Sequence, residues 1–574
     1  MIKKPSVSIS KLTFSGGSSF DLNKGDKVIL VGPNNSGKSQ TLREILSVCG
    51  NGKTDNTFVV KGVDIVKDGT AEQLREFLSA EAEFNGTTYS YKSWQLHERQ
   101  ISFWAGAFLE GQILSGFVRN ISANDRLSIC EKQQSVSRGE QKTKPQHVLY
   151  DDSALMEKIS SLFYRAFGKD LMFDFRGGRT LPIHVGKLPN MSGVVDRVGD
   201  EYVSAVRKLP LLDQQGDGMK SYAGILFETI VDDWDITLVD EPEAFLHPPQ
   251  MRRLGETLSS EVGGQLFVAT HSSDILRGFL EGTQGDVRIL RISREENINI
   301  VMEASKETIK SLWLNPVLRY SNALEGIFHE QTIICEDDSD CRLLNSIADY
   351  LESDTQSQWL DTAYVPTGGK HGVAQVADVL RKVGVPVKAV FDIDFLSERD
   401  LVEVTVVAFG GSWSEISVLW SRVDSAVRGG AKVQSVSGIK KNIIEIINNS
   451  GEDSMPKSDI LEAMKQGKPW SVVKKYGERG IPRGQAQVDY KDLKNKLEEI
   501  GIYLVPVGEI ENFCPEMGLH GPKFVAKLLS TVSLGDQRLA ELRDFVENLQ
   551  RGATCKLMAV EDIESAESNA ACAS

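Results

Sequence analysis

The 574-residue chain lacks the features that mark secreted and membrane proteins. Its seven cysteines are scattered and include no C-x-x-C pair, which argues against a disulfide framework and against a zinc knuckle. No apolar run approaches the ~20 residues that a membrane helix needs, and the first residues do not form a signal segment. We therefore expect a cytoplasmic protein with reduced thiols and no membrane association.

The chain also lacks an excess of positive charge. Lysine and arginine number 65 against 80 aspartate and glutamate residues, which gives a formal net charge of −15. Such a surface does not coat DNA uniformly, so a DNA site must be a local basic groove or metal ions held on carboxylates. At about 150 residues per domain, the length predicts roughly two to four domains.

A glycine-rich turn directly follows a hydrophobic strand pattern at residues 27–31. It reads G-P-N-N-S-G-K-S over residues 32–39, the spacing of a phosphate-binding loop at a strand-to-helix junction. Backbone N–H groups can surround a phosphate there, Lys38 reaches the β- and γ-phosphates, and Ser39 can ligate Mg²⁺. The residues predicted to hold a nucleoside triphosphate are Gly32, Asn35, Ser36, Gly37, Lys38, Ser39 and Gln40.

A second ATPase pattern lies further along the chain. The apolar and β-branched residues 236–239 end in Asp240 and Glu241, where a buried parallel strand would present Asp240 to Mg²⁺ and Glu241 to the attacking water. The next strand pattern ends at His271, which places an imidazole near the γ-phosphate. Residues 215–221 form a glycine-rich lead into a helix, which an ordinary turn at a helix start would explain equally well.

These motifs together resemble the ABC-type ATPases of the RecF, SMC and OLD group. The resemblance rests on the phosphate loop, the glycine-rich segment, the run D-E-P-E-A-F-L-H-P at residues 240–248, and T-H-S at residues 270–272. It implies an ATP-dependent dimer of heads in which the signature segment of one protomer covers the nucleotide of the other. Lys220 and Ser221 would then contact that nucleotide, although the segment departs from the usual S-G-G form.

Three further hydrophobic strand patterns each end in acidic residues. These acids are Glu336 and Asp340, Asp392 and Asp394, and Glu509 and Glu511. Parallel strands bring their carboxyl ends to one edge of a sheet, and clustered carboxylates need cations, for which oxygen ligands favour Mg²⁺ or Mn²⁺. Two such ions would support phosphodiester hydrolysis. Any one acid could instead cap a helix, but the recurrence at three strand ends favours a metal site.

This half of the chain resembles a TOPRIM domain, the metal-binding module of topoisomerases, primases and OLD-family nucleases. T-G-G-K at residues 367–370 matches a loop of the OLD version, and the resemblance implies a basic residue beyond the late acids, Lys523 or Lys527. Asp337 replaces the usual glycine after the lead glutamate, a departure that bears on metal geometry. The resemblance implies that Glu336 is the lead glutamate with Asp340 as its partner, that Asp392 and Asp394 form the D-x-D pair, and that Glu509 and Glu511 are the late acids. The metal ligands of the ATPase half remain Ser39 and Asp240, as its own motifs predict.

We predict an α/β chain with three parts. An ABC-type ATPase domain spans residues 1–325 with a large insertion at about 65–213, to which no chemistry is assigned. A Rossmann-like TOPRIM domain spans residues 326–550 with a helical insertion at about 398–499, and residues 551–574 form an acidic disordered tail. The helical insertion alternates basic and aromatic residues, as a nucleic-acid groove does, although a solvated helix face explains the pattern too. These residues are Lys465, Lys468, Trp470, Lys474, Lys475, Tyr476, Arg479 and Arg483.

An ATPase followed by a TOPRIM domain is the order found in the OLD-family ATP-dependent nucleases, and the chain is identified as a member of that family. The resemblance implies a DNA endonuclease or nickase with ATP and Mg²⁺ or Mn²⁺ as cofactors. It also implies a homodimer or higher oligomer in anti-phage defence, with phage DNA as target and a second component, a protein or a retron-type RNA–DNA complex, as trigger. The alternative is a non-catalytic ATP-gated clamp of RecF type with a degenerate TOPRIM site. A topoisomerase or primase is disfavoured, because no fitting tyrosine context or zinc module is present.

Overall fold

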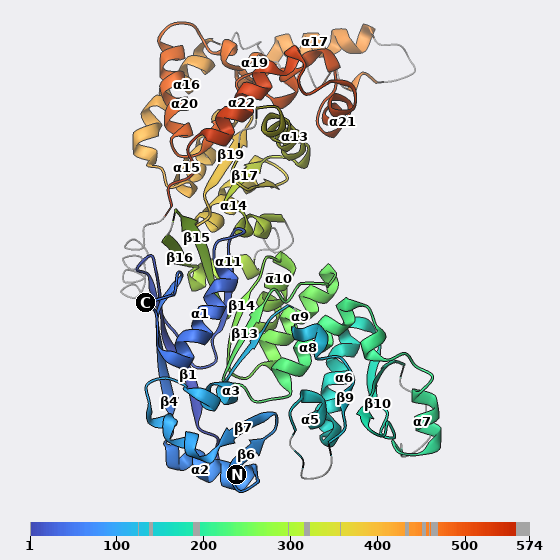
Figure 1. Ribbon diagram of the computed structural model, residues 1–574. Coiled ribbons are helices and arrows are strands. Elements are labelled where there is room, and N and C mark those ends of the chain that lie inside the picture. Colours follow the sequence, from blue (N-terminus) through green and yellow to red (C-terminus); the bar gives the residue numbers. More distant parts are fainter. Residues whose placement is uncertain are drawn as a thin grey trace. The chain divides into compact units, whose positions relative to one another are not determined.

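The computed structural model describes residues 2–123, 125–136, 140, 142–187, 196–296, 298–314, 322–355, 358–430, 436–449, 455–457, 460 and 469–557. The chain divides into two compact units, Met1–Asn315 and Pro316–Ser574 (Figure 1). Lys465 and Lys468 of the predicted basic run, and residues 558–574 of the predicted tail, lie outside the described residues. Among the helices that are described, none is long and apolar enough to cross a membrane.

The first unit is built on a six-stranded sheet with the order β16-β15-β3-β14-β13-β8. The strands are β3 (Lys27–Val31), β8 (Val118–Ile121), β13 (Ile236–Asp240), β14 (Gln265–Ala269), β15 (Arg288–Glu295) and β16 (Ile298–Glu303). All pairs are parallel except β15 with β16. The three central strands are almost wholly buried, which fits their apolar sequences without alternation. Because β3, β13 and β14 are neighbours, the predicted phosphate loop, acidic pair and histidine follow adjacent strands at one edge.

Helices and a small antiparallel sheet cover this central sheet. The antiparallel sheet has the order β2-β1-β4, with β1 (Ser6–Phe14), β2 (Ser19–Asp21) and β4 (Val60–Asp68). Leu42 and Ile45 of α1 (Lys38–Asn51) share an apolar cluster with Val28 and Leu30 of β3, so the helix that follows the phosphate loop is held firmly against its strand. The other helices of the core are α8 (Asp217–Ile230), α9 (Pro248–Glu261), α10 (Ser273–Thr283) and α11 (Lys306–Leu314).

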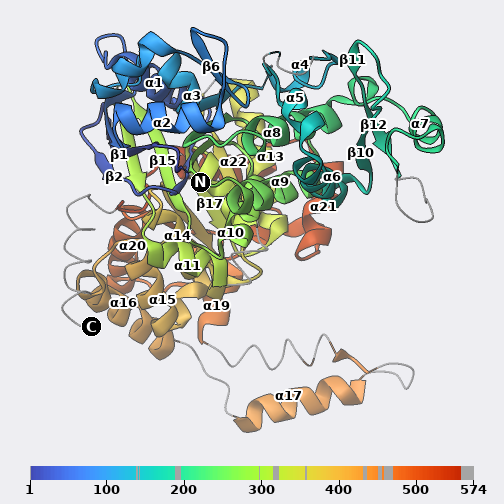
Figure 2. The same ribbon diagram turned by 90° about the horizontal axis from the view of Figure 1, so that it is seen from below.

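The segment predicted as a large insertion is not wholly separate from the ATPase core. Its strand β8 pairs in parallel with β13 and forms the edge of the central sheet. The other elements are α2 (Ala71–Glu81), β5 (Glu83–Phe84), β6 (Thr88–Tyr91), β7 (Trp94–His97), α3 (Leu114–Phe117), α4 (Asp125–Ser128), β9 (Gln133–Gln134), α5 (Pro145–Asp151), α6 (Ser153–Phe167), β10 (Asp170–Phe173), β11 (Thr180–Leu181), β12 (Ile183–Gly186) and α7 (Asp200–Val206). Figure 2 shows α7, β10 and β12 beside α6 and away from α1.

The second unit has a four-stranded parallel sheet with the order β18-β17-β19-β20. The strands are β17 (Gln331–Cys335), β18 (Thr362–Pro366), β19 (Val387–Phe391) and β20 (Ile502–Leu504). Each of the three strands predicted to end in acids, β17, β19 and β20, is a neighbour of another, so their acids emerge at one edge. The helices α13 (Asp338–Thr355), α14 (Lys370–Lys382), α21 (Pro522–Thr531) and α22 (Ala540–Arg551) accompany this sheet.

The predicted helical insertion contains the helices α15 (Arg399–Ala408), α16 (Trp413–Gly430), α17 (Val436–Asn449), α19 (Pro469–Tyr476) and α20 (Gln485–Glu498). Trp470, one of the two aromatics of the predicted basic run, is buried, and its Nε1 donates to Asp424 Oδ1 at 2.8 Å. The ring of Trp470 anchors α19 in the core, so this residue fits neither an open nucleic-acid groove nor a solvated helix face. Tyr476 is exposed at the end of the same helix.

Position 32 requires glycine because of its backbone conformation and because a neighbouring carbonyl lies close to it. A comparison with Gly25, which has only the first of these constraints, makes the requirement testable. Gly32 has φ +134°, and a Cβ there would lie 2.1 Å from Ile292 O. Gly25 has φ +101°, but a Cβ there would meet no atom within 4 Å, so it carries the conformational cost alone. We expect Gly32→Ala to cost at least about 2 kcal/mol more than Gly25→Ala in denaturant unfolding. Equal losses would show that the loop does not need this close backbone approach.

Candidate functional site

The loop after β3 is shaped by left-handed backbone and by a buried lysine. Gly32, Asn35 and Gly37 have φ of +134°, +60° and +102°. Lys38 is 3% exposed, and its Nζ donates to Gly32 O at 2.8 Å and to Pro33 O at 2.7 Å. Burial lowers the pKa of Lys38 to about 8, while nearby carboxylates oppose the shift. Lys38 thus stands at the centre of the loop, where a phosphate group would restore its full charge.

Asn299 of β16 supports the loop from the neighbouring strand pair. Its Nδ2 donates to Ser36 O at 2.6 Å, and it lies 3.1 Å from the position that a Cβ on Gly37 would take. Sequence reasoning missed Asn299, because no motif surrounds it. Gln40, a predicted nucleotide contact, donates its side-chain N–H to Glu44 Oε1 at 2.9 Å and thereby lies along α1.

The predicted Mg²⁺ ligands of the ATPase half lie side by side. Ser39 Oγ donates to Asp240 Oδ1 at 2.8 Å, although the two residues are 201 positions apart in the chain. Burial raises the pKa of Asp240, and the hydrogen bond from Ser39 opposes this. The arrangement joins the phosphate loop to the end of β13, as the sequence predicts for a nucleotide site.

Glu241 and His271 also come together at this edge. Glu241 has φ +47°, and its Oε1 lies 4.0 Å from His271 Nε2. Burial and the charge of Lys38 lower the pKa of His271 to about 4, so its imidazole is neutral at pH 7. A neutral ring can accept or donate one hydrogen bond at each nitrogen without repelling Lys38.

Two residues that organise this edge were not assigned from the sequence. Glu243 accepts hydrogen bonds from Thr270 Oγ1 at 2.9 Å and from His271 N at 2.6 Å, so it holds the end of β14. Arg126 of α4 is 0% exposed, and its Nη2 donates to Glu241 O at 2.7 Å. Glu243 lies in the D-E-P-E run and could have been singled out. Arg126 stands alone in a segment to which no chemistry was assigned.

The glycine-rich signature segment begins α8, and its two predicted contacts differ. Lys220 is partly exposed and forms an ion pair with Asp217 Oδ1 at 2.7 Å. Ser221 is fully buried, and its Oγ donates to Ala244 O at 3.2 Å. A contact between Ser221 and a nucleotide on another protomer would therefore require α8 to rearrange, whereas the prediction for Lys220 needs no such change.

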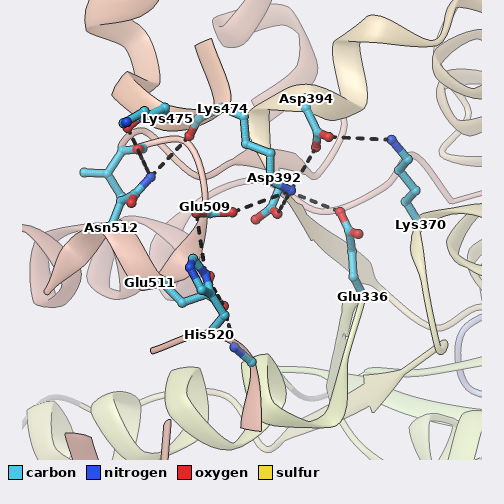
Figure 3. Close-up of polar contacts among 12 residues, drawn as sticks. Glu336, Lys370, Asp392, Asp394, Lys474, Lys475, Glu509, Glu511, Asn512 and His520 are labelled. Atoms are coloured by element: carbon cyan, nitrogen blue, oxygen red, sulfur yellow. Dashed lines mark hydrogen bonds and ion pairs between the residues drawn. The ribbon is translucent and has the colours of Figure 1, made fainter. Parts of the chain in front are cut away.

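The acids of the second unit converge on one lysine at the carboxyl edge of its sheet (Figure 3). Lys474 Nζ lies 2.8 Å from Asp392 Oδ2, 3.6 Å from Asp394 Oδ1 and 3.7 Å from Glu509 Oε2. Glu336 joins the group, because its Oε1 accepts a hydrogen bond from Asp392 N at 3.3 Å. The structure thus brings together acids from β17, β19 and β20.

Burial and the charges of neighbouring carboxylates raise the pKa values of these acids. Burial raises the pKa of Asp392 to about 8, even though Lys474 opposes the shift. The pKa of Asp340 rises to about 7, because of burial and then the charge of Glu511. The pKa values of Glu336 and Glu509 are raised in the same way, chiefly by burial. A divalent cation would relieve this excess of negative charge.

A second group of donor atoms adjoins Lys474. One ligand atom each from Glu509, Glu511 and His520 lie within 4.8 Å of one another, a separation that suits a shared metal ion. Glu511 Oε1 also accepts a hydrogen bond from Gly521 N at 2.6 Å, which fixes its orientation. His520 is exposed and was missed, because it follows neither a strand nor a recognisable motif.

Lys474 and Lys370, both named from the sequence in other patterns, lie beside the acids. Lys523 is exposed on α21, as is Lys527, and the proposed role of Lys523 stays a prediction. The ion pairs given above come instead from Lys474 of the helical insertion, and Lys370 of the T-G-G-K loop lies 2.7 Å from Glu398 Oε1 and 4.0 Å from Asp394 Oδ2. The lysine at the centre of the acids therefore comes from the insertion.

The unusual Asp337 does not displace the lead glutamate. Asp337 is exposed, and its Oδ1 accepts a hydrogen bond from Asp338 N at 2.6 Å at the start of α13. Glu336 is held on its other side, where its backbone oxygen accepts from Gly369 N at 2.8 Å. The departure from glycine is thus accommodated at the surface, and Glu336 still reaches Asp392.

The raised pKa of Asp340 predicts a pH-dependent cost to stability. The unfolded chain ionises this group near its ordinary pKa of 3.8, whereas the folded chain does so at about 7, so ionisation destabilises the fold as pH rises between these values. We expect Asp340→Asn to stabilise the metal-free protein by ~1–3 kcal/mol at pH 8 and much less at pH 4. Calorimetry in a chelator, with the exposed Asp338→Asn as control, measures this. A gain that does not depend on pH would contradict it.

Two family models match parts of the chain. Residues 139–277 match "AAA domain, putative AbiEii toxin, Type IV TA system", and residues 327–394 match "Overcoming lysogenization defect protein-like, TOPRIM domain". No curated protein matches the chain. The matches confirm an ATPase domain followed by an OLD-like TOPRIM domain within an α/β fold, consistent with the predicted OLD-family resemblance.

The chain is also similar to several solved structures. An SMC head bound to the C-winged helix domain of ScpA is 14% identical, covers 52% of this chain and 97% of its own, and has a TM-score of 0.33. The SMC head domain from Thermotoga maritima is 12% identical, covers 52% and 99%, and has a TM-score of 0.27. The ADP conformation of an ATP-binding cassette of an ABC transporter is 13% identical, covers 55% and 97%, and has a TM-score of 0.24.

Proposed function

We propose that this chain, an ATPase domain joined to an OLD-like TOPRIM domain, is an ATP-binding, divalent-metal-dependent DNA endonuclease or nickase whose head gates the TOPRIM site. The observation that carries the proposal is the convergence of acids from three adjacent strand ends on a single ammonium group. Clustered carboxylates destabilise the folded protein unless they bind cations. Their presence at one edge of the sheet therefore favours a cation-binding function.

The residues present fit a divalent metal. The donor set consists of carboxylate oxygens, which suit Mg²⁺ and Mn²⁺, and its members are Glu336, Asp340, Asp392, Asp394 and Glu509 with Glu511 beside them. Once bound there, such ions would polarise a phosphodiester and lower the pKa of a coordinated water. The protein contributes the fixed positions: Asp392 N holds Glu336, and Gly521 N holds Glu511.

Two lysines supply the positive charge that a phosphodiester needs. Lys474 and Lys370 both face the D-x-D pair, Lys474 directly and Lys370 at 4.0 Å from Asp394. Their ammonium groups can hold the anionic backbone of DNA against the carboxylates, which would otherwise repel it. A site that combines these two ammonium groups with the acids fits phosphodiester hydrolysis better than metal binding alone.

The first unit fits ATP with Mg²⁺. The backbone of residues 32–39 would hold the phosphates, Lys38 would give up its carbonyl partners to pair with them, and Ser39 and Asp240 would hold the ion. Glu241, held at its backbone oxygen by Arg126, is placed to orient water, and the neutral His271 stands beside it. This arrangement supports ATP binding as the control step, with hydrolysis as the reset.

The proposed assembly is a homodimer or higher oligomer in which Lys220 of one head reaches the nucleotide of another. An oligomer would let ATP binding change access to the TOPRIM site. The role in anti-phage defence, phage DNA as target, and a protein or a retron-type RNA–DNA complex as trigger rest on the family resemblance alone. Cytoplasmic action with no membrane is part of the same proposal.

The alternative, a RecF-type clamp with a degenerate TOPRIM site, rests on Asp337, whose Oδ1 accepts a hydrogen bond from Asp338 N at the start of α13. One nuclease assay separates the two. The full chain is incubated with supercoiled and linear DNA in Mg²⁺ or Mn²⁺, with and without ATP, beside Lys38→Ala and Asp392→Ala. Scission that Asp392→Ala removes supports the nuclease. Retention of DNA that depends on ATP and Lys38, without scission in any metal, supports the clamp.

A further inference from the structure

The ammonium of Lys474 stands at the place that a metal ion would need. It lies 2.8 Å from Asp392 Oδ2, and its distances to Asp394 Oδ1 and Glu509 Oε2 are 3.6 and 3.7 Å. Mg²⁺ and Mn²⁺ bind carboxylate oxygens at ~2.0–2.2 Å, so an ion shared by these three oxygens would overlap the ammonium. The metal and Lys474 therefore compete for the same oxygens.

The backbone of Lys474 is fixed to the loop that carries Glu509. Asn512 Nδ2 donates to Lys474 O at 3.2 Å and to Val507 O at 3.1 Å. A Cβ on Gly508 would lie 2.0 Å from Lys474 O, so only glycine permits this close approach. The buried Trp470 anchors the same helix through Asp424. Because the backbone is fixed, the fold keeps the start of the Lys474 side chain beside the acids.

One monovalent ammonium does not satisfy the acids around it. Four carboxylates, those of Glu336, Asp392, Asp394 and Glu509, lie in contact with Lys474 or with one of its partners. Lys370, the other lysine near the pair, already has Glu398 at 2.7 Å. The group keeps a negative excess that a divalent ion would neutralise better. Once such an ion is bound, it occupies the carboxylate oxygens that Lys474 contacts. The ammonium of Lys474 then lacks these partners, while its backbone stays fixed and its flexible side chain can turn elsewhere.

We propose that Lys474 exchanges partners: it pairs with the carboxylates of the D-x-D pair and Glu509 before metal binds, and it contacts a DNA phosphate after the metal has taken its place. The inference rests on the proposed metal site. A phosphate is the anionic group that the proposed substrate brings to this point, and Lys474 can reach it by rotating its side chain alone.

Partner exchange makes the binding of metal and the binding of DNA positively cooperative. In the absence of DNA, metal binding must break the ion pairs of Lys474, whereas bound DNA offers the ammonium a replacement. By thermodynamic linkage, DNA then tightens metal binding by the same factor as metal tightens DNA binding. A neutral side chain at this position would remove both the competition and the coupling.

The experiment measures Mn²⁺ affinity of the full chain without nucleotide, from the paramagnetic resonance signal of free Mn²⁺. Wild type and Lys474→Met are compared with and without a duplex whose phosphorothioate linkages slow hydrolysis. Lys475→Met is the matched control, because it removes the same charge from the next residue, whose ammonium lies over Tyr476. Lys474→Gln repeats the test with a polar side chain, and circular dichroism confirms folding of each variant.

We expect Lys474→Met and Lys474→Gln to bind Mn²⁺ about tenfold more tightly than wild type without DNA, and to lose the gain that DNA gives wild type. Lys475→Met should resemble wild type. Affinity in both Lys474 variants that equals or falls below that of wild type would overturn the inference. If Asp392→Asn also binds Mn²⁺ as wild type does, the proposed metal site itself fails. If Asp392→Asn loses the ion while Lys474→Met changes nothing, only the exchange is wrong.

Discussion

Asp392→Asn is expected to lower Mg²⁺- or Mn²⁺-dependent DNA cleavage by at least about a hundredfold. The substitution keeps the size of the side chain but removes the charge that would make Asp392 a metal ligand. It also removes the ion pair with Lys474, so the ammonium of that lysine no longer has its nearest partner. The measurement is the rate at which supercoiled plasmid is nicked at a fixed concentration of Mn²⁺.

The control for this substitution is Asp378→Asn, which removes an equivalent charge on α14. Asp378 pairs with Lys382 at 2.8 Å, one turn along the same helix, and takes no part in the acid group. ATP hydrolysis by Asp392→Asn should remain at the wild-type rate, because the residue lies in the second unit. Cleavage by Asp392→Asn within a few-fold of wild type would show that this acid group is not the cutting site.

Lys38→Ala is expected to weaken ATP binding by about 10- to 150-fold, the loss for a charge-assisted contact worth ~1.5–3 kcal/mol. Lys38 is the buried cation of the loop, and its ammonium donates to two loop carbonyls that phosphate oxygens would replace. Titration calorimetry with ATP and Mg²⁺ gives the affinity. The exposed Lys53 provides a matched control, because Lys53→Ala removes a lysine just beyond the end of α1.

The same substitution tests whether the head controls the cutting site. Lys38→Ala should leave Mn²⁺ binding to the acid group unchanged, while its DNA cleavage becomes insensitive to added ATP. If Lys38→Ala bound ATP as tightly as wild type, the loop at residues 32–39 would not be the nucleotide site. If cleavage in the variant still responded to ATP, control would have to come from elsewhere in the chain.

Local motifs allowed much of both candidate sites to be predicted from sequence. The phosphate loop is encoded by neighbouring residues, so its strand, its glycines and the position of Lys38 follow from spacing alone. The acids at Glu336, Asp392 and Glu509 could be grouped because parallel strands open at one edge, and the structure places them there. The pairing of Ser39 with Asp240 follows from the same rule in the first unit.

The positions of Lys474 and Arg126 depend on tertiary contacts that no local pattern records. Lys474 precedes its partner Glu509 by a helix and a strand, and only the docking of α19 against the loop after β20 places it among the acids. The alternation of basic and aromatic residues fitted a groove or a solvated helix face, and neither explanation places Trp470 in the core, where it lies. Arg126 was missed for a similar reason, because its partner Glu241 lies far along the chain.

We propose that an ATP-binding head controls a metal-dependent cutting site carried by the other unit. The most direct test is the rate of plasmid nicking in Mn²⁺ as a function of ATP concentration, for wild type, Lys38→Ala and Asp392→Asn. We expect wild type to cut at a rate that changes with ATP, Lys38→Ala to cut at a rate that does not, and Asp392→Asn not to cut. No scission by wild type in any divalent metal, with ATP-dependent retention of DNA, would contradict the claim.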